Sequence, residues 1–197
     1  MRIGRDISMN DKKKLIVGIT GASGVILGIE LLKEMRLFEE WETELIISSS
    51  AKTTIALETT YDFEEIKSFA TRFYENNEMG SNVASGTYKT DAMIIVPCSM
   101  KTVAGIATGY SDNLLLRAAD VTIKEKRQLI IVPRETPLNA IHLRNLLTLA
   151  ELGIQIIPPL VAYYHQPKTI DDHNQQIIGR ILDNLQLNHP AYKRWEK

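Results

Sequence analysis

The sequence predicts an α/β fold in which a mostly parallel, doubly wound sheet lies between two helical layers, a three-layer αβα arrangement. Two observations favour it. Short apolar runs of strand length recur along the chain, and segments with apolar residues at helical spacing lie between them. Strands that alternate with helices through right-handed crossovers build this class of sheet. A content of 44% hydrophobic and 24% charged residues excludes a disordered or fibrous chain.

Each element follows from its own pattern. Five apolar runs bounded by turn residues are expected to be buried strands: residues 15–19, 45–48, 93–97, 129–133 and 154–157. Apolar residues at helical spacing predict helices over residues 25–36, 51–58, 102–108, 114–126, 139–152 and 169–185. The segment 63–85 has the least regular pattern, and an extra strand is expected near residues 69–74.

Length, charge and cysteine content limit the class of protein. A chain of 197 residues fits one domain, and we expect residues 1–13 to be a flexible leader and residues 14–197 a single domain. A formal net charge of -1 gives no sign of nucleic-acid binding, and no apolar run is long enough for membrane insertion. Cys98 is the sole cysteine, which excludes an internal disulfide and favours a reducing compartment. We therefore expect a cytoplasmic protein.

A glycine-rich turn follows the first predicted strand. Gly21, Ala22 and Ser23 lie where the backbone passes close to a ligand and where the N–H groups of the next helix face an anion. This favours a phosphate site, and a tight turn of small residues is the alternative. The spacing is G-x-x-G-x-x-G rather than G-x-G-x-x-G, and Ser48 ends the second strand where a dinucleotide site needs an acid. NAD is therefore not expected.

A second polar segment follows the strand at residues 93–97. Ser99, Met100, Lys101 and Thr102 bring two hydroxyls, a positive charge and free N–H groups to the start of the next helix. An anion cradle and plain helix capping by Ser99 are equally compatible with this pattern. Cys98 has no basic partner nearby in the sequence, so we interpret it as a small buried residue at a strand end.

Basic side chains follow later strands. Arg117 and Lys124 lie seven residues apart, two turns along one helix face. Arg134 and Glu135 lie between two prolines at a strand end, and a surface ion pair is the alternative to a functional role. We expect four cations and a phenol to converge on one anion, namely Arg117, Lys124, Arg134, Arg180 and Tyr164.

Two adjacent acids do not indicate a metal site. Asp171 and Asp172 follow Thr169, which is typical of the capping box and acidic first turn of a helix. No further carboxylate or histidine has a ligand spacing that would complete a site with them. We therefore expect no catalytic metal.

Six motifs in order resemble those of the UbiX-type flavin prenyltransferases. They are GASG at residues 21–24, ASG at 84–86, PCSMKT at 97–102, RAAD at 117–120, PRETP at 133–137 and YHQP at 164–167. AKTTI at residues 51–55, LET at 57–59 and NHPAYKRW at 188–195 look like the branch formed by the B-type subunits of hydroxyarylic (phenolic) acid decarboxylases. The resemblance implies a Rossmann-like sheet of the flavoprotein type.

The resemblance also implies roles for single residues. It places FMN, in its reduced form, against Gly21, Ala22, Ser23, Ser48, Ser99, Met100, Lys101, Thr102 and Arg134. The donor, dimethylallyl phosphate, would contact Ser85, Lys124, Tyr164, Arg180 and Trp195. Glu135, Lys124, Tyr164 and Arg117 would take part in catalysis. Glu135 is the group suited to proton transfer, because the cations can balance the charge of the leaving phosphate without a metal.

The activity implied by the resemblance is a metal-independent transferase reaction. A dimethylallyl group would move from dimethylallyl phosphate to N5 and C6 of reduced FMN, making prenylated FMN for a UbiD-type aromatic acid decarboxylase. A homododecamer with sites at subunit contacts is implied as well. Two alternatives are a flavin-dependent oxidative decarboxylase and a non-catalytic flavin-carrying subunit of a decarboxylase. The first relies on an Asn motif that residues 84–86 lack, and the second needs no second phosphate site.

Overall fold

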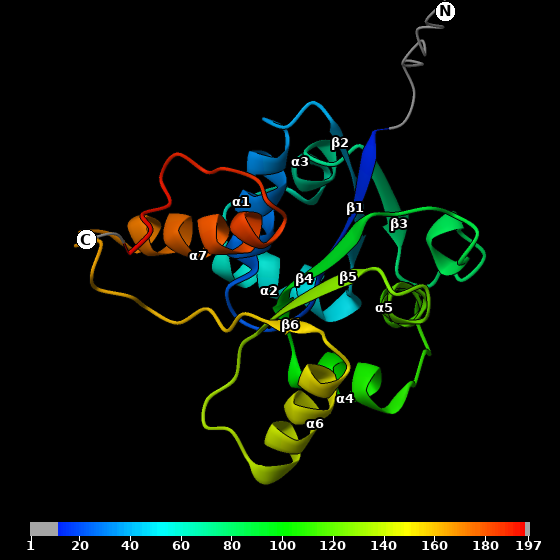
Figure 1. Cartoon of the computed structure of the whole chain (residues 1–197). Coiled ribbons are helices and arrows are strands. Elements are labelled where there is room, and N and C mark those ends of the chain that lie inside the picture. The colour runs from blue at the N-terminus through cyan, green and yellow to red at the C-terminus, as the bar shows by residue number, and fades with distance from the viewer. Residues whose placement is uncertain (1–11, 196–197) are drawn as a thin grey trace, which may run out of the picture.

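Residues 12–195 form a six-stranded parallel sheet covered by helices on both faces in the computed structural model (Figure 1). The strands are β1 (Lys13–Ile19), β2 (Trp41–Ile47), β3 (Arg72–Glu75), β4 (Ala92–Cys98), β5 (Gln128–Pro133) and β6 (Gln155–Ile156). The helices are α1 (Val25–Met35), α2 (Ser49–Glu58), α3 (Phe63–Ser68), α4 (Met100–Thr108), α5 (Leu114–Lys124), α6 (Ala140–Glu151) and α7 (Ile170–Asn184), with a 3₁₀ turn η1 (Asn82–Ala84). The predicted fold class is confirmed.

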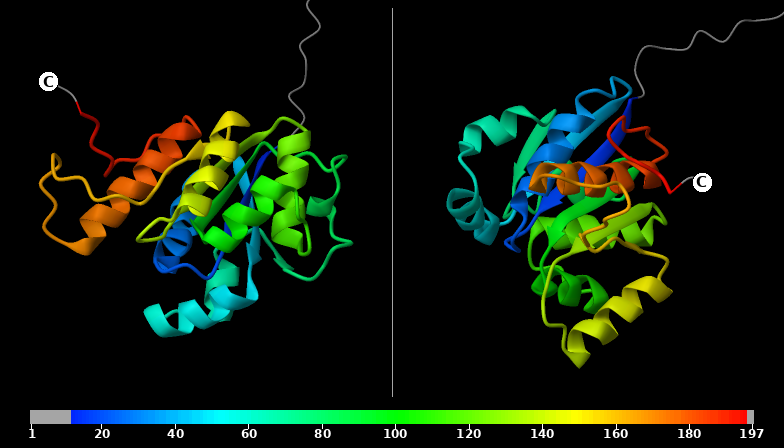
Figure 2. Two further views of the ribbon diagram at one scale, coloured as in Figure 1. Left: turned by 90° about the horizontal axis from the view of Figure 1, so that it is seen from below. Right: turned by 90° about the vertical axis from the view of Figure 1, so that its left-hand side faces the viewer.

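Alternate residues of each strand pack into two separate cores. Leu15, Val17 and Ile19 of β1 face one core, which α1, α2, α3 and α7 complete. Ile16 faces the other, completed by α4, α5 and α6. Figure 2 shows the sheet between these two helical layers. Because both faces are buried, the strands are continuous apolar runs rather than alternating ones, which makes them recognisable in the sequence.

Some boundaries differ from the prediction. The strand predicted at residues 45–48 begins earlier, at Trp41. The prediction missed its first residues because Glu42 and the buried Glu44 interrupt the apolar run, although both residues pair with β1. α3 lies in the segment that had no regular pattern, and the extra strand covers residues 72–75 rather than 69–74. The leader predicted at residues 1–13 lies mostly outside the described residues, but Lys13 already pairs with Trp41 as the first residue of β1.

The strand order places a ligand crevice. It runs β3-β2-β1-β4-β5-β6, so the chain winds outward in one direction from β1 and in the other from β4. In open parallel sheets, ligands bind beyond the carboxyl ends of the strands at such a switch point. Here that point lies between β1 and β4, where Leu15 pairs with Ala92.

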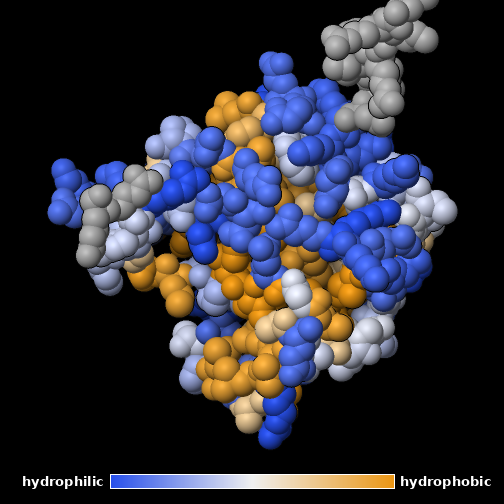
Figure 3. All heavy atoms as spheres, in the orientation of Figure 1, coloured by the Kyte–Doolittle hydropathy of each residue, from blue (hydrophilic) through white to orange (hydrophobic). Residues whose placement is uncertain are grey.

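One helix shows an apolar face to the solvent. Ile141, Leu143 and Leu147 of α6 are 53–63% exposed, and Leu138 and Leu152 beside it are also exposed. Figure 3 shows orange side chains gathered over α6 in the lower part of the molecule. No helix within residues 12–195 combines the length and the apolar character needed to cross a bilayer.

Candidate functional site

Three cavities follow one another along the carboxyl edge of the sheet. The first, the cradle cavity, is a polar space of about 270 Å³. Its lining comes from the segments that follow β1, β2, β3 and β4: Thr20, Ser48, Ser49, Ser50, Asn76, Ser99, Lys101, Thr102, Asn113, Leu115 and Leu116. It therefore occupies the switch point.

Three helices begin at the cradle cavity. Ser48 caps α2 by accepting a hydrogen bond from the N–H of Ala51 at 3.2 Å, and Asn113 caps α5 by accepting one from Leu116 at 3.0 Å. Ser99 caps α4 in the same way. Capping by Ser99, one of the two alternatives that the sequence left open, is thus present. The free N–H groups of the first turns also give the cavity a partial positive charge that suits a phosphate, the other alternative.

A buried threonine fixes the floor of this cavity. The Thr20 hydroxyl donates to the carbonyl of Pro97 at 2.7 Å and accepts the N–H of Ser99 at 2.8 Å, which ties the end of β1 to the end of β4. A Cβ added at Gly21 would lie 2.6 Å from the Ser50 side chain, so only glycine lets the turn after β1 pass this close to α2. The donor-rich lining and Lys101 fit the phosphate and polar groups of FMN.

The predicted phosphate residues divide into two groups. Ser48, Ser99, Lys101 and Thr102 line the cradle cavity, whereas residues 21–23 belong to the turn beside it. Just after that turn, the N–H of Gly24 donates to the Glu58 carboxylate at 2.8 Å. One of the N–H groups expected to face an anion at the start of α1 therefore already has a carboxylate partner.

The second cavity, the middle cavity, follows β5. It measures about 340 Å³ and is mostly apolar, with a lining of Met100, Pro133, Arg134, Glu135, Thr136, Leu138, Leu146, Pro158, Pro159 and Leu160. Glu135 accepts a hydrogen bond from the N–H of Thr136 at 2.9 Å. Arg134 and Glu135 thus bring a positive and a negative charge to the wall of an otherwise apolar space.

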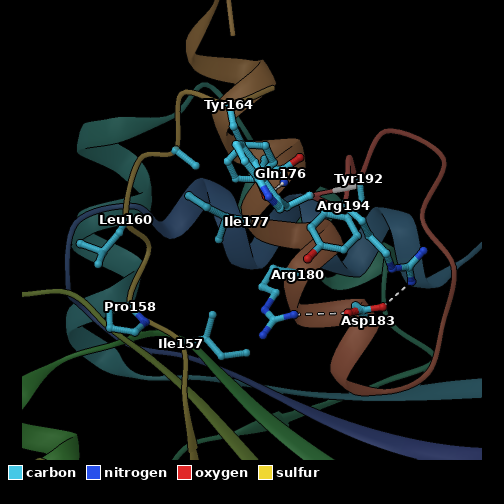
Figure 4. Close-up of a pocket in the computed structure, with 12 residues that line it drawn as sticks. Ile157, Pro158, Leu160, Tyr164, Gln176, Ile177, Arg180, Asp183, Tyr192 and Arg194 are labelled. Atoms are coloured by element: carbon cyan, nitrogen blue, oxygen red, sulfur yellow. Dashed lines mark hydrogen bonds and ion pairs between the residues drawn. The ribbon is translucent and has the colours of Figure 1, made fainter. Parts of the chain in front are cut away.

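The third cavity, the tail cavity, follows β6 and measures about 460 Å³. α7, the C-terminal tail and the segment between β6 and α7 form its walls (Figure 4). The lining residues are Ile157, Pro158, Leu160, Ala162, Tyr164, Gln176, Ile177, Arg180, Asp183, Tyr192, Arg194 and Trp195. Arg180 pairs with Asp183 at 3.4 Å, and Asp183 also pairs with Arg194 of the tail. The rings of Tyr164 and Trp195 meet edge to face, with 5.5 Å between centroids.

The middle cavity shares a wall with the tail cavity and adjoins the cradle cavity along α4, and we call the three together the trough. Pro158 and Leu160 line both the middle and the tail cavity. Met100 of the middle cavity is followed on α4 by Lys101 of the cradle cavity. The middle cavity, with Glu135 in its wall, therefore lies between the segments that line the cradle cavity and those that line the tail cavity.

Three further predicted site residues lie away from the trough of their own chain. Arg117 donates from Nε to the carbonyl of Ala84 at 3.1 Å and pairs with Asp120 at 2.6 Å. Lys124 pairs with Glu125 at 3.2 Å, and Ser85 lies in the exposed segment after η1. One protomer by itself therefore does not bring all four predicted cations onto one anion, because α5 directs two of them toward η1.

Comparison with known proteins identifies the family. The family model described as Flavoprotein matches residues 4–184. A probable UbiX-like flavin prenyltransferase from Sedimentibacter hydroxybenzoicus is 49% identical over 93% of this chain and 97% of its own length. The flavin prenyltransferase UbiX of Methanocaldococcus jannaschii is 49% identical over 92% of this chain and 98% of its own. The chain belongs to the UbiX-like flavin prenyltransferases.

Solved structures agree with this assignment. A dodecameric FMN-dependent UbiX-like decarboxylase from Escherichia coli O157:H7 has a TM-score of 0.92 and 46% identity, covering 93% of this chain and 100% of its own. AnUbiX (PadA1), solved with FMN and dimethylallyl pyrophosphate, has a TM-score of 0.92 and 41% identity. The match covers 95% of this chain and 99% of the AnUbiX chain. The peptidyl-cysteine decarboxylase EpiD, at 19% identity and a TM-score of 0.60, shares the fold alone.

Two other groups in this flavin prenyltransferase are structural. Cys98 is fully buried, and burial raises the pKa of its thiol far above the ordinary value, so it is an inert packing residue. The N–H groups of Lys168 and Thr169 bind the Asp172 carboxylate and hold its pKa below the ordinary value. The predicted capping box of α7 is therefore confirmed.

Sequence reasoning missed several residues of the trough. Gln176 and Asp183 lie one turn before and one turn after Arg180 on α7, so the spacing of a helix face could have found them. Asn113 precedes an apolar helical run, which is a capping signal. Asn76 has no such signal, because only the folded chain brings its side chain to the N–H of Leu115 at the start of α5.

Proposed function

We propose that this flavin prenyltransferase moves a dimethylallyl group from dimethylallyl phosphate to N5 and C6 of reduced FMN within the trough. The cradle cavity is suited to the FMN phosphate, and the tail cavity, with Arg180 and Tyr164, to the phosphate of the donor. The observation that carries the proposal is that an apolar cavity beside Glu135 lies between the polar cradle cavity and the tail cavity that holds Arg180 and Tyr164. When bound, reduced FMN supplies the two nucleophilic positions.

The residues of the trough have separate tasks in this reaction. The C–O bond of the donor breaks with its electron pair going to the departing phosphate, and Arg180, Arg134 and the Tyr164 hydroxyl stabilise that charge. The two new bonds release one proton from N5 and one from C6, of which one goes to the alkene of the dimethylallyl group and the other to the phosphate. Glu135 is the carboxylate positioned to move these protons. Met100 and Leu138 exclude water from the allylic cation.

Neighbouring subunits complete the site in this proposal. Arg117, Lys124 and Ser85 lie outside the trough of their own chain, near η1. The exposed apolar face of α6 is suited to contact with another copy, since such faces mark interfaces. We propose a homododecamer, the state named for the related E. coli O157:H7 structure, in which Lys124 and Arg117 of one protomer approach the donor phosphate of the next.

The product is proposed to serve a separate enzyme. Prenylated FMN made here would pass to a UbiD-type aromatic acid decarboxylase in the cytoplasm, where the sole cysteine stays reduced. A flavin-storing subunit would need the cradle cavity alone, so the tail cavity with its Arg180 and Tyr164 favours an enzyme. The cysteine decarboxylases SpaF and EpiD share the fold at 16% and 19% identity, which is no argument for their activity here.

The proposal is tested by anaerobic incubation of the protein with reduced FMN and dimethylallyl phosphate, followed by mass spectrometry of the flavin. We expect one added dimethylallyl group with loss of phosphate, and no change in yield when EDTA is present, since side chains supply the positive charge. Unmodified FMN after incubation would contradict the proposed transfer. A parallel reaction with the pyrophosphate donor distinguishes the two donors.

Replacing Glu135 by Gln separates proton transfer from binding. The amide keeps the shape of the carboxylate but cannot take up a proton, so we expect prenyl transfer to slow by about 10²–10⁴-fold. FMN affinity should stay close to the wild-type value, because Glu135 does not line the cradle cavity. Single-turnover absorbance with mass analysis measures the first quantity and equilibrium dialysis the second. Near-normal turnover of this variant would contradict the role of Glu135.

A further inference from the structure

A buried glutamine on α7 has both polar atoms of its side chain engaged beside the tail cavity. Gln176 is 6% exposed and lies one turn before Arg180. Its Nε2 donates to the Tyr164 hydroxyl oxygen at 2.7 Å and to the carbonyl of Lys193 at 2.9 Å. Its Oε1 accepts the N–H of Lys193 at 3.1 Å. Figure 4 shows Gln176 beside Tyr164 in the wall of this cavity.

The backbone of Lys193 fixes which end of the amide faces the phenol. A backbone N–H can only donate and a backbone carbonyl can only accept. Oε1 of Gln176 must therefore face the Lys193 N–H, and Nε2 must face the Lys193 carbonyl. The other Nε2 hydrogen then points at the Tyr164 oxygen. Because the phenol oxygen accepts this hydrogen bond, its own O–H hydrogen must point elsewhere. Tyr164 and Arg180 line the same cavity, which leaves that hydrogen available to a ligand there.

The same amide joins the C-terminal tail to the cavity. Lys193 lies between Tyr192, which packs against Gly179, and Arg194, which pairs with Asp183. A Cβ at Gly179 would overlap the Tyr192 side chain, so the helix has a glycine where the tail crosses it. Farther along the tail, Trp195 contacts the Tyr164 ring. Gln176 thus holds both the phenol and the wall that carries Trp195.

We propose that Gln176 is a positioning residue that makes Tyr164 a hydrogen-bond donor to the departing phosphate. The inference rests on the proposed function, since it needs a donor phosphate in the tail cavity. Gln176 itself does not touch the phosphate. Its amide fixes the direction of the Tyr164 O–H and holds residues 192–195 of the tail against α7.

Three variants separate these tasks. Gln176→Glu keeps an oxygen that accepts the Lys193 N–H, but it loses the Nε2 that donates to Tyr164 and to the Lys193 carbonyl and it adds a negative charge. The phenol then donates to the new carboxylate instead of to the phosphate. Gln176→Leu removes the hydrogen bond to Tyr164 and both hydrogen bonds to the backbone of Lys193. Gln175→Leu is the matched control, because Gln175 is the adjacent, half-buried glutamine of the same helix.

The assay measures kcat/KM for dimethylallyl phosphate in the wild type and in each variant, alone and combined with Tyr164→Phe. We expect Gln176→Glu to lower kcat/KM about 10- to 100-fold, the value of one hydrogen bond to a charged group, while the affinity for FMN stays unchanged. In the Tyr164→Phe background the loss of kcat/KM caused by the same change should be at least about fivefold smaller, because the hydroxyl through which Gln176 acts is gone, whereas the added negative charge acts in both backgrounds and cancels in the comparison. The control Gln175→Leu should have the kcat/KM of the wild type.

Hydrogen exchange of the C-terminal peptide completes the test. The Lys193 amide should exchange faster in Gln176→Leu than in Gln176→Glu, which keeps its acceptor. Wild-type kcat/KM in Gln176→Glu, or an equal loss with and without the Tyr164 hydroxyl, would overturn the positioning role while leaving the proposed function intact. A wild-type protein that makes no prenylated FMN would overturn the proposed function and this inference together.

Discussion

Single residues of the cradle cavity serve the helix and the ligand site at once. Ser48 caps α2 and lines the cavity, so its replacement must preserve the cap if binding is to be tested. Asp caps helices as well as Ser does, but it adds a negative charge. We predict that Ser48→Asp lowers FMN affinity by tens of fold, since two like charges about 8 Å apart repel by about 2 kcal/mol at an effective dielectric constant of about 20.

The control for this charge is Ser48→Asn, which caps without a charge. Equilibrium dialysis of FMN compares the two variants with the wild type, and thermal unfolding verifies that α2 is intact. Equal FMN affinities in Ser48→Asp and Ser48→Asn would show that no phosphate lies near this helix N-terminus.

A buried acid in β2 makes a second prediction about single residues. Glu44 is 1% exposed and accepts a hydrogen bond from the Tyr88 hydroxyl at 2.5 Å, with Arg72 at 3.4 Å. Burial and the bond to Glu44 raise the pKa of Tyr88 above its ordinary value. The folded state therefore favours the protonated phenol, so this contribution to stability is complete below about pH 10 and is lost as the pH rises through the raised pKa.

Tyr88→Phe tests this linkage. At neutral pH the variant should be less stable by about 1–3 kcal/mol, because the Glu44 carboxylate loses a donor in a buried place. Its urea midpoint should also depend less on pH above about pH 10 than that of the wild type. Tyr110→Phe, at an exposed tyrosine, is the control. A pH dependence identical to that of the wild type would contradict the shifted pKa.

Among the elements, α1 is held against the sheet by a glycine. A Cβ at Gly28 would lie 2.5 Å from the Val96 carbonyl oxygen and 2.9 Å from the Ile19 side chain. The helix therefore approaches β1 and β4 as closely as its backbone allows. This contact sets the position of the turn that precedes α1, next to the cradle cavity.

We predict that Gly28→Ala destabilises the protein by about 1–3 kcal/mol through overpacking, even though alanine favours helices. For a chain of this size that lowers the melting temperature by about 2–12 °C. Gly80→Ala is the matched control, because nothing lies within 4 Å of a Cβ at that position. Thermal unfolding followed by circular dichroism measures both, and equal melting temperatures would contradict the tight packing.

For the molecule as a whole, the apolar face of α6 predicts dependence on assembly. Leu147 is 59% exposed in the single chain, and a charge there should oppose burial against a neighbouring copy. We expect Leu147→Asp to form a smaller species than the wild type in light scattering, with unchanged circular dichroism. Prenyl transfer should fall with it, because Arg117 and Lys124 of the neighbour no longer approach the trough.

The control for assembly is Leu37→Asp, at a leucine that is 69% exposed but lies after α1, away from α6. We expect this variant to retain the wild-type mass of the assembly in light scattering and the wild-type rate of prenyl transfer. A fully assembled Leu147→Asp variant would contradict the interface on α6. An active smaller species would contradict the shared site while leaving the interface in place.

Local sequence patterns were enough to locate the strands, most helices and the polar turns that follow the strands. Buried parallel strands are apolar runs, and a cap such as Ser99 lies three residues from the N–H it binds. Parallel strands also bring their carboxyl ends to one edge, so the strand pattern predicts a candidate site at that edge. The start of β2 at Trp41 was missed, since the burial of Glu44 depends on Tyr88, a partner far away in the sequence.

Which of the polar groups meet depends on the folded chain. Arg180 and Tyr164 share one cavity, whereas Arg117 of the same chain turns toward η1. Gln176 binds Tyr164 and the backbone of Lys193. Neither result follows from spacing, because contacts between distant segments are set by how the helices and the tail pack on the sheet and not by any local pattern.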